Sequence, residues 1–105
     1  MKIQDLKENL DEDSFISILF HNDVTKSRYF MILKEYIKNQ SKYEGIRDFL
    51  LEQKLPNMQF MNFIEECKTM GLIRVNNNEI KLSFDFLNKL EQIKSNWKNY
   101  VKSVQ

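Results

Sequence analysis

The feature that most restricts the fold of this chain is the order of local patterns between residues 43 and 83. Large apolar residues recur at helical steps through 42–53, namely Tyr43, Ile46, Phe49 and Leu50. Leu55 and Pro56 interrupt this pattern, and Asn57 is placed to cap a second helix, whose inward-facing residues are Phe60, Phe63, Ile64 and Cys67. The spacing therefore predicts two helices joined by a tight turn.

A helix stop and a short hairpin follow. Gly71 can adopt the left-handed conformation that commonly ends a helix. The runs 72–75 and 79–82 are compatible with β-strands, and between them lie Asn76, Asn77 and Asn78. Because asparagine tolerates positive φ in tight turns, we expect a two-stranded hairpin here.

The segment 84–104 predicts a long amphipathic helix. Its apolar positions follow alternating steps of three and four once Lys94 is counted: Leu87, Leu90, Trp97, Val101 and Val104. Phe86, Ile93 and Tyr100 widen this arc beyond a simple coiled-coil seam, so we expect part of the helix to cover its own core and part to meet another chain.

Lysines lie along one flank of that helix. Lys94, Lys98 and Lys102 form either a stripe facing phosphates or a solvated edge whose aliphatic stems cover apolar surface. Trp97 and Tyr100 beside them are expected to be core or dimer anchors, with stacking on single-stranded bases as the other reading.

The first 41 residues predict three further helical segments. Ile3, Leu6 and Leu10 indicate a short helix, which Asp11 to Asp13 interrupt, so 1–13 is interpreted as an acidic helix and connector. Ser14 is expected to cap the apolar run 15–20, which is either a short buried helix or a strand. Helix is favoured because no nearby strand could pair with it. Asp23 or Thr25 is expected to open a longer helix that carries Phe30, Leu33 and Ile37 on one face and ends at 39–41.

Composition supports one mainly helical domain over 1–105. A chain of 105 residues with 42% hydrophobic content can build one core but hardly two. Aromatic residues are plentiful, whereas two Gly and one Pro leave little material for a β fold with many turns. We therefore predict a mainly α fold with a small β-hairpin.

Several function classes are disfavoured by the residues present. His21 is the only histidine and Cys67 the only cysteine, and no nucleophile and base are recognisable together, so we expect no enzyme, metal or cofactor. Cys67 is expected to be a small buried hydrophobe. No segment approaches the ~20 apolar residues that span a bilayer, so we expect a cytoplasmic protein without a membrane partner.

The net charge is +1, and it is unevenly distributed. Residues 1–24 carry −4, and the remaining residues carry +5. A domain that binds DNA strongly through phosphates is usually more basic, with a pI above about 9.

In element order and spacing, residues 46–82 resemble winged helix-turn-helix proteins. The phrase Lys68-Thr69-Met70-Gly71-Leu72-Ile73 is similar to the end of a recognition helix, where two apolar residues enter the wing. A short domain ending in a long helix also resembles PadR-like regulators and small replication-terminator proteins. The resemblance implies a helix-turn-helix plus wing over 42–83 and a dimerisation helix over 84–104.

The same resemblance implies a DNA-binding surface. The exposed side of the second motif helix would face the major groove with Asn57, Met58, Gln59, Met61, Asn62 and Lys68. Amide side chains suit adenine edges and methionine suits thymine methyls, so an AT-rich duplex is chemically sensible. Phosphate contacts would come from Lys42, Lys54, Arg74 and Lys81, and the homodimer interface from Leu87, Leu90, Trp97, Val101 and Val104.

Two function classes therefore stay open. The first is a small dimeric transcription regulator that binds double-stranded DNA. The second is a winged-helix adaptor or accessory subunit of a replication or mobile-element machinery, in which the same surface binds a protein. Met58 and Met61, together with the acidic pair Glu65 and Glu66, favour the second class because carboxylates near phosphate weaken DNA binding.

Overall fold

The protein is mainly helical, with one antiparallel hairpin and a long C-terminal helix, which confirms the predicted fold class. A computed structural model describes residues 12–105. The chain divides into two compact units, Met1–Asn39 and Gln40–Gln105, and each is described by itself. The single domain expected over 1–105 stays a prediction, and the helix expected over 3–10 lies outside the described residues.

The first unit contains α2 (Glu12–Leu19) and α3 (Val24–Asn39), which pack on each other. The helix expected over 15–20 is present but begins at Glu12. Ser14 is therefore inside the helix, and its prediction as an N-cap is wrong. The acidic connector was expected to extend to residue 13, but Glu12 and Asp13 already belong to α2.

A tight turn separates these two helices. His21 and Asn22 both adopt left-handed backbone, with φ of 53° and 64°. Asp23 then caps α3, because its Oδ1 accepts a hydrogen bond from the backbone N–H of Lys26 at 3.0 Å. Thus Asp23, one of the two predicted caps, starts the helix.

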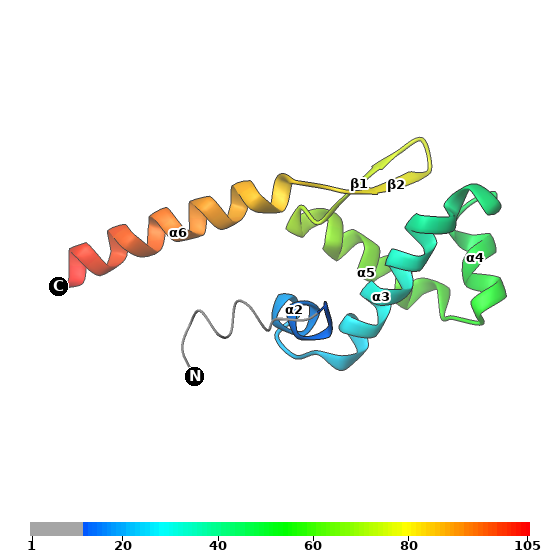
Figure 1. The fold of residues 1–105 in the computed structure, drawn as a ribbon, viewed down its shortest axis with the longest axis horizontal. Helices are drawn as coiled ribbons and strands as arrows, with labels where there is room; N and C mark the ends of the chain where they lie inside the picture. Colours follow the sequence, from blue (N-terminus) through cyan, green and yellow to red (C-terminus); the bar gives the residue numbers. More distant parts are fainter. Residues whose placement is uncertain (1–11) are drawn as a thin grey trace. The chain divides into compact units, whose positions relative to one another are not determined.

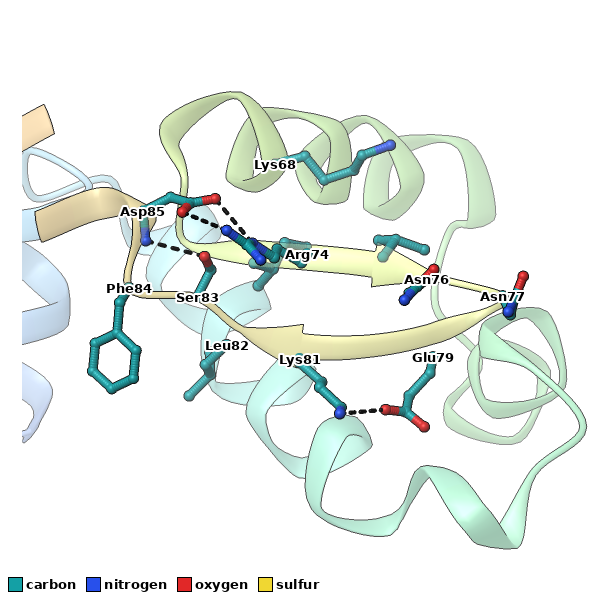
Figure 2. Close-up of a pocket in the computed structure, with 12 residues that line it drawn as sticks. Lys68, Arg74, Asn76, Asn77, Glu79, Lys81, Leu82, Ser83, Phe84 and Asp85 are labelled. Carbon is teal, nitrogen blue, oxygen red and sulfur yellow. Dashed lines mark hydrogen bonds and ion pairs between the residues drawn. The ribbon is translucent and has the colours of Figure 1, made fainter. Parts of the chain in front are cut away.

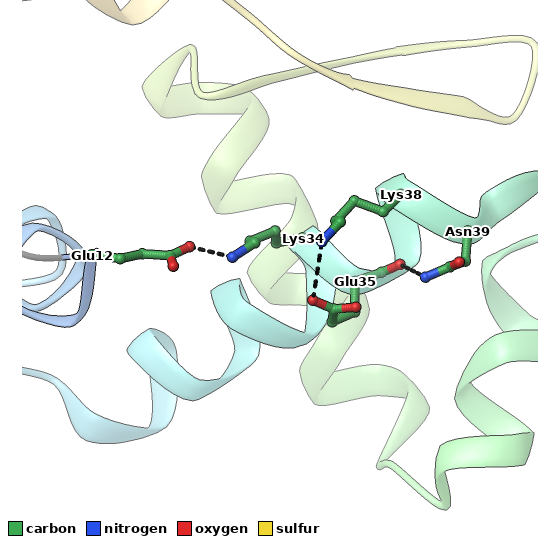
Figure 3. A network of polar contacts seen from close by, with 5 residues as sticks. All are labelled: Glu12, Lys34, Glu35, Lys38 and Asn39. Carbon is green, nitrogen blue, oxygen red and sulfur yellow. Dashed lines mark hydrogen bonds and ion pairs between the residues drawn. The ribbon is translucent and has the colours of Figure 1, made fainter.

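Apolar contacts stabilise the first unit, and two exposed ion pairs lie on its surface. The rings of Phe20 and Phe30 lie 5.4 Å apart, and Leu33 is completely buried. The buried residues of α3 are Tyr29, Leu33 and Tyr36. Of the three residues predicted to face inward only Leu33 is buried, because Phe30 and Ile37 are half-buried. Figure 3 shows Lys34 paired with Glu12 across the two helices and Lys38 paired with Glu35 on α3. The Lys38 nitrogen and the Glu35 carboxylate oxygen are 3.9 Å apart.

The second unit begins with the 3-10 turn η1 (Gln40–Lys42), followed by α4 (Ile46–Gln53) and α5 (Asn57–Met70). The first motif helix therefore starts at Ile46, later than the predicted residue 42. The cause is local: Tyr43 N–H bonds the carbonyl of Gln40 at 3.1 Å, closing the 3-10 turn, and Gly45 has extended backbone. Pro56 occupies the N-cap position of α5, so the prediction of Asn57 as its cap is wrong.

Gly71 ends α5 as predicted, with φ of 83°. Its N–H bonds the carbonyl of Lys68, and the N–H of Leu72 bonds that of Cys67 at 2.9 Å, so the last carbonyls of the helix are satisfied. The predicted hairpin follows as β1 (Ile73–Asn76) and β2 (Glu79–Leu82), in antiparallel register. Asn77 and Asn78 both have positive φ, as this tight turn requires.

The core of the second unit lies between α4, α5 and the inner face of the hairpin. Its buried side chains are Phe49, Leu50, Phe60, Phe63, Ile64, Cys67, Leu72, Ile73 and Ile80. Cys67 is fully buried, as predicted. The side-chain amide of Gln40 makes two hydrogen bonds to the backbone of Ile80 on β2. Its Nε2 donates to the Ile80 carbonyl at 2.7 Å, and its Oε1 accepts from the Ile80 N–H at 3.0 Å.

The last element, α6 (Asp85–Val104), is attached to the second unit through its first turns. Phe86 N–H bonds the carbonyl of Gly71 at 3.0 Å, and Lys89 donates to the carbonyl of Thr69. Beyond these contacts α6 extends away from α5 and the hairpin (Figure 1). Within the described residues, no helix combines the length and apolar character needed to cross a membrane.

Candidate nucleic-acid interface and association helix

The exposed side of α5 is polar, but the predicted residues do not share one face. Successive residues of a helix are about 100° apart, so Met58 and Asn62 project opposite the buried residues Phe60 and Cys67. Both are exposed, as is Asn57 on the first turn. Gln59 is also exposed but lies on the other flank, away from the hairpin.

Met61 and Lys68 turn toward the hairpin. Together with Val75 and Ile80 they line a hollow of about 410 Å³ between the start of α4, α5 and the hairpin. Glu65 lies in the same hollow, and its carboxylate is 3.3 Å from the Lys68 ammonium. The charge of the predicted contact residue Lys68 is therefore partly neutralised within its own helix.

The hairpin carries a polar outer face, because paired residues of an antiparallel ladder project to the same side. Arg74 is paired with Lys81, and Asn76 with Glu79. These residues line a groove of about 880 Å³ that also includes Lys68. Two of the predicted phosphate contacts, Arg74 and Lys81, thus line one groove, but Figure 2 shows Arg74 turned toward Asp85 and Lys81 turned toward Glu79.

The cations on this groove are engaged by carboxylates. Arg74 donates to both carboxylate oxygens of Asp85, at 3.0 and 2.8 Å, and Lys81 lies 3.1 Å from Glu79 (Figure 2). The bidentate hydrogen bonds lower the pKa of Asp85 and raise that of Arg74. Sequence reasoning missed both carboxylates. The role of Asp85 depends on where α6 begins, whereas Glu79 lies two residues before Lys81 on β2, and this spacing on one face of a strand was a signal available in the sequence.

The remaining predicted phosphate contacts lie outside both hollows. Lys42 ends η1, and Lys54 follows α4 in left-handed backbone with φ of 56°. Both side chains are exposed. A residue that sequence reasoning did not select, Arg47, lines the smaller hollow beside Met61. Arg47 was not selected because the helix was predicted to begin at residue 42, whereas α4 begins at Ile46 and so places Arg47 on its first turn.

Six large apolar residues of α6 are exposed: Leu87, Leu90, Ile93, Trp97, Tyr100 and Val104. Among Asp85–Val104 none of the side chains is buried. The predicted dimer residues Leu87, Leu90, Trp97 and Val104 are exposed, and Val101 is half-buried. The part of this helix that covers its own unit is limited to the first turn, where Phe86 is half-buried. Trp97 is 64% exposed and stacks on Tyr100, with the ring centroids 5.8 Å apart.

The lysines on the flank of this helix, Lys94, Lys98 and Lys102, are all exposed. Their exposure is compatible with a phosphate-facing stripe and with a solvated edge. Within residues 12–105, no group of three or more His, Cys, Asp or Glu side chains is placed to hold a metal ion. His21 lies in the turn between α2 and α3.

Comparison with known proteins gave no match: no family model, no curated protein and no solved structure matches the chain. The resemblance to winged helix-turn-helix proteins therefore stays a prediction.

Proposed function

We propose that the protein is a small dimeric regulator of winged-helix type that binds double-stranded DNA in the cytoplasm. The observation that carries this proposal is the exposed polar side of α5 beside a hairpin that gathers Arg74 and Lys81 on one groove. In this arrangement α5 enters the major groove and the hairpin follows the phosphate backbone. The exposed apolar side of α6 supports pairing of two copies.

The residues on α5 suit an AT-rich site. Asn57 and Asn62 carry amides that can pair with adenine, and Met58 is exposed where it could contact a thymine methyl. Lys42 and Lys54 supply phosphate contacts. Arg74 and Lys81 supply two more phosphate contacts when they release the carboxylates of Asp85 and Glu79. This exchange costs little free energy, because exposed ion pairs contribute little net stability.

The proposal is tested by fluorescence anisotropy with random and AT-rich duplex pools, with single strands alongside. Tight binding to the duplex that falls roughly 10-fold in Asn62→Ala supports it, since one lost bidentate base contact corresponds to about 1–3 kcal/mol. The matched control is Asn99→Ala, an exposed asparagine on the polar side of α6. Equal loss in both variants, or no duplex binding by the wild type, would refute this surface.

A second candidate function is a protein-binding adaptor. Glu65 on α5 is exposed, and Lys68, Arg74 and Lys81 all have carboxylate partners. These observations favour a protein ligand over a polyanion. The adaptor reading predicts a stable complex that is lost in Met58→Glu, because Met58 is 77% exposed and its change leaves the core intact. Gln92→Glu on α6 adds the same charge elsewhere and is expected to keep the complex.

A further inference from the structure

The apolar side of α6 contains a coiled-coil seam that differs from the predicted one; its first residue, Phe86, is half-buried and the other five residues are exposed. Six apolar residues follow alternating steps of four and three without interruption: Phe86, Leu90, Ile93, Trp97, Tyr100 and Val104. This is the spacing that keeps one side of a helix against a second helix. Lys94 is then not a core position of the seam but lies on its flank.

We propose that a second copy of this chain covers the seam with its own α6 in antiparallel orientation, with the two-fold axis crossing the seam midway between Ile93 and Trp97. The inference rests on the dimer of the proposed function and adds its geometry. In this register, residues whose numbers add to 190 lie opposite each other. The seam residues then pair with one another as Phe86 with Val104, Leu90 with Tyr100, and Ile93 with Trp97.

Side-chain size favours this orientation. Antiparallel pairing places one aromatic residue against one aliphatic residue in each of these layers. Parallel pairing would place each residue against its own copy, so that Trp97 meets Trp97 and Tyr100 meets Tyr100 while Leu90 meets only Leu90. Alternating large and small partners fill a helix interface evenly, whereas layers of unequal width force the helices apart or leave gaps.

The residues flanking the seam favour it independently. In the antiparallel arrangement Leu87 lies beside Val101 of the second copy, so the apolar surface is extended at both ends. Lys94 meets its own copy once, near the axis. In the parallel arrangement Lys89 would lie beside Lys94 of the second copy on both sides of the dimer, and Val101 would lie beside Asn96. The parallel dimer would therefore be less stable, because two pairs of lysines repel each other and each Val101 contacts an amide instead of an apolar side chain.

The antiparallel arrangement also sets a distance. A helix of 20 residues is about 30 Å long, so the two points at which α6 joins its unit lie about 30 Å apart along the pair. Half-sites on one face of B-DNA are about 34–36 Å apart. The spacing is thus of the order needed for two copies of α5 to contact successive turns of a duplex.

Cysteine cross-linking distinguishes the two orientations without changing the seam. Lys94→Cys and Lys89→Cys alter exposed flank positions, and the native Cys67 is completely buried. The full chain carrying each change is treated with a short bis-maleimide, alone and as an equal mixture, at a concentration well above that of dimer dissociation. Asn99→Cys, on the polar side of α6, and the wild-type chain are the controls.

The antiparallel dimer predicts that Lys94→Cys alone gives a covalent dimer and that Lys89→Cys alone does not. A product that forms only in the mixture would instead show parallel pairing and overturn the proposal. Absence of any linked product, or a monomer by sedimentation at every concentration, would overturn it as well. Duplex binding by the wild type is scored separately, so a linked dimer that ignores DNA removes only the proposed DNA function.

Discussion

Trp97→Ala is expected to weaken self-association strongly while leaving the fold of the chain unchanged. A Trp side chain buries about 150–250 Å² when fully covered, and Trp97 is 64% exposed, so roughly 100–160 Å² is available for contact with a partner. At about 25 cal/mol per Å², covering half of this area contributes ~1–2 kcal/mol per chain. A dimer contains two such residues, so the dissociation constant should rise about 30-fold to 1000-fold.

Sedimentation equilibrium over a range of concentrations measures that constant, and circular dichroism with urea unfolding at low concentration reports the monomer. Asn99→Ala on the opposite side of α6 is the matched control and should match the wild type in both. An unchanged dissociation constant in Trp97→Ala would refute pairing through this face. A large loss of monomer stability would also contradict the structure, because Trp97 packs on Tyr100 outside the core.

Three further predictions concern the second unit. Gly71→Ala should cost more than about 1 kcal/mol in urea unfolding, because φ is 83° and a Cβ would lie 3.1 Å from a backbone nitrogen of α6. Gly45→Ala, with nothing within 4 Å of its Cβ, should stay within about 0.5 kcal/mol of the wild type. Gln40→Ala should destabilise the unit by ~1–3 kcal/mol, because two partly buried hydrogen bonds to the edge of β2 are lost; Gln92→Ala, at an exposed position, should not. The pKa of Asp85 is lowered in the folded protein, so Asp85 contributes to the free energy of unfolding above the ordinary aspartate pKa, and this contribution is lost as the pH falls through the folded pKa. Arg74→Gln should therefore raise the Asp85 pKa measured by NMR. The same change should make the free energy of unfolding depend less on pH in the acid range.

Features that depend on a few neighbouring residues could be predicted from the sequence. Gly71 stops a helix and Asn77 and Asn78 form a turn because their backbone conformations are rare for other residues. Cys67 belongs to an apolar stripe with helical period, and that periodicity alone indicates its burial. The type and order of the elements in 46–104 followed from these signals.

Helix starts were harder to predict, because several residues compete to cap the same turn. Ser14 is a good cap by type, yet the backbone is already helical at Glu12. Similarly, the apolar spacing that includes Tyr43 is compatible with a helix, but the extended backbone of Gly45 delays α4 to Ile46. Local propensity sets what a residue can do, and packing of the whole element decides where the helix begins.

The electrostatics of the candidate site depend on which carboxylates the cations contact. Arg74 and Lys81 were expected to face phosphate, and the hairpin does place them on one groove. Their pairing with Asp85 and Glu79 depends on side-chain geometry that a count of charges does not contain. The charge available to a polyanion is therefore smaller than the sequence suggested.

The most direct test of the account is the affinity of the wild-type chain for duplex DNA as a function of salt concentration. A protein that neutralises phosphates releases counterions, so the logarithm of the binding constant should fall linearly with the logarithm of the salt concentration, with a slope of about −0.9 per phosphate contacted. Contacts from Lys42, Lys54, Arg74 and Lys81 predict a slope of roughly −3 to −4 for each copy that binds. No binding at low salt, or binding that salt does not weaken, would contradict the DNA-binding proposal.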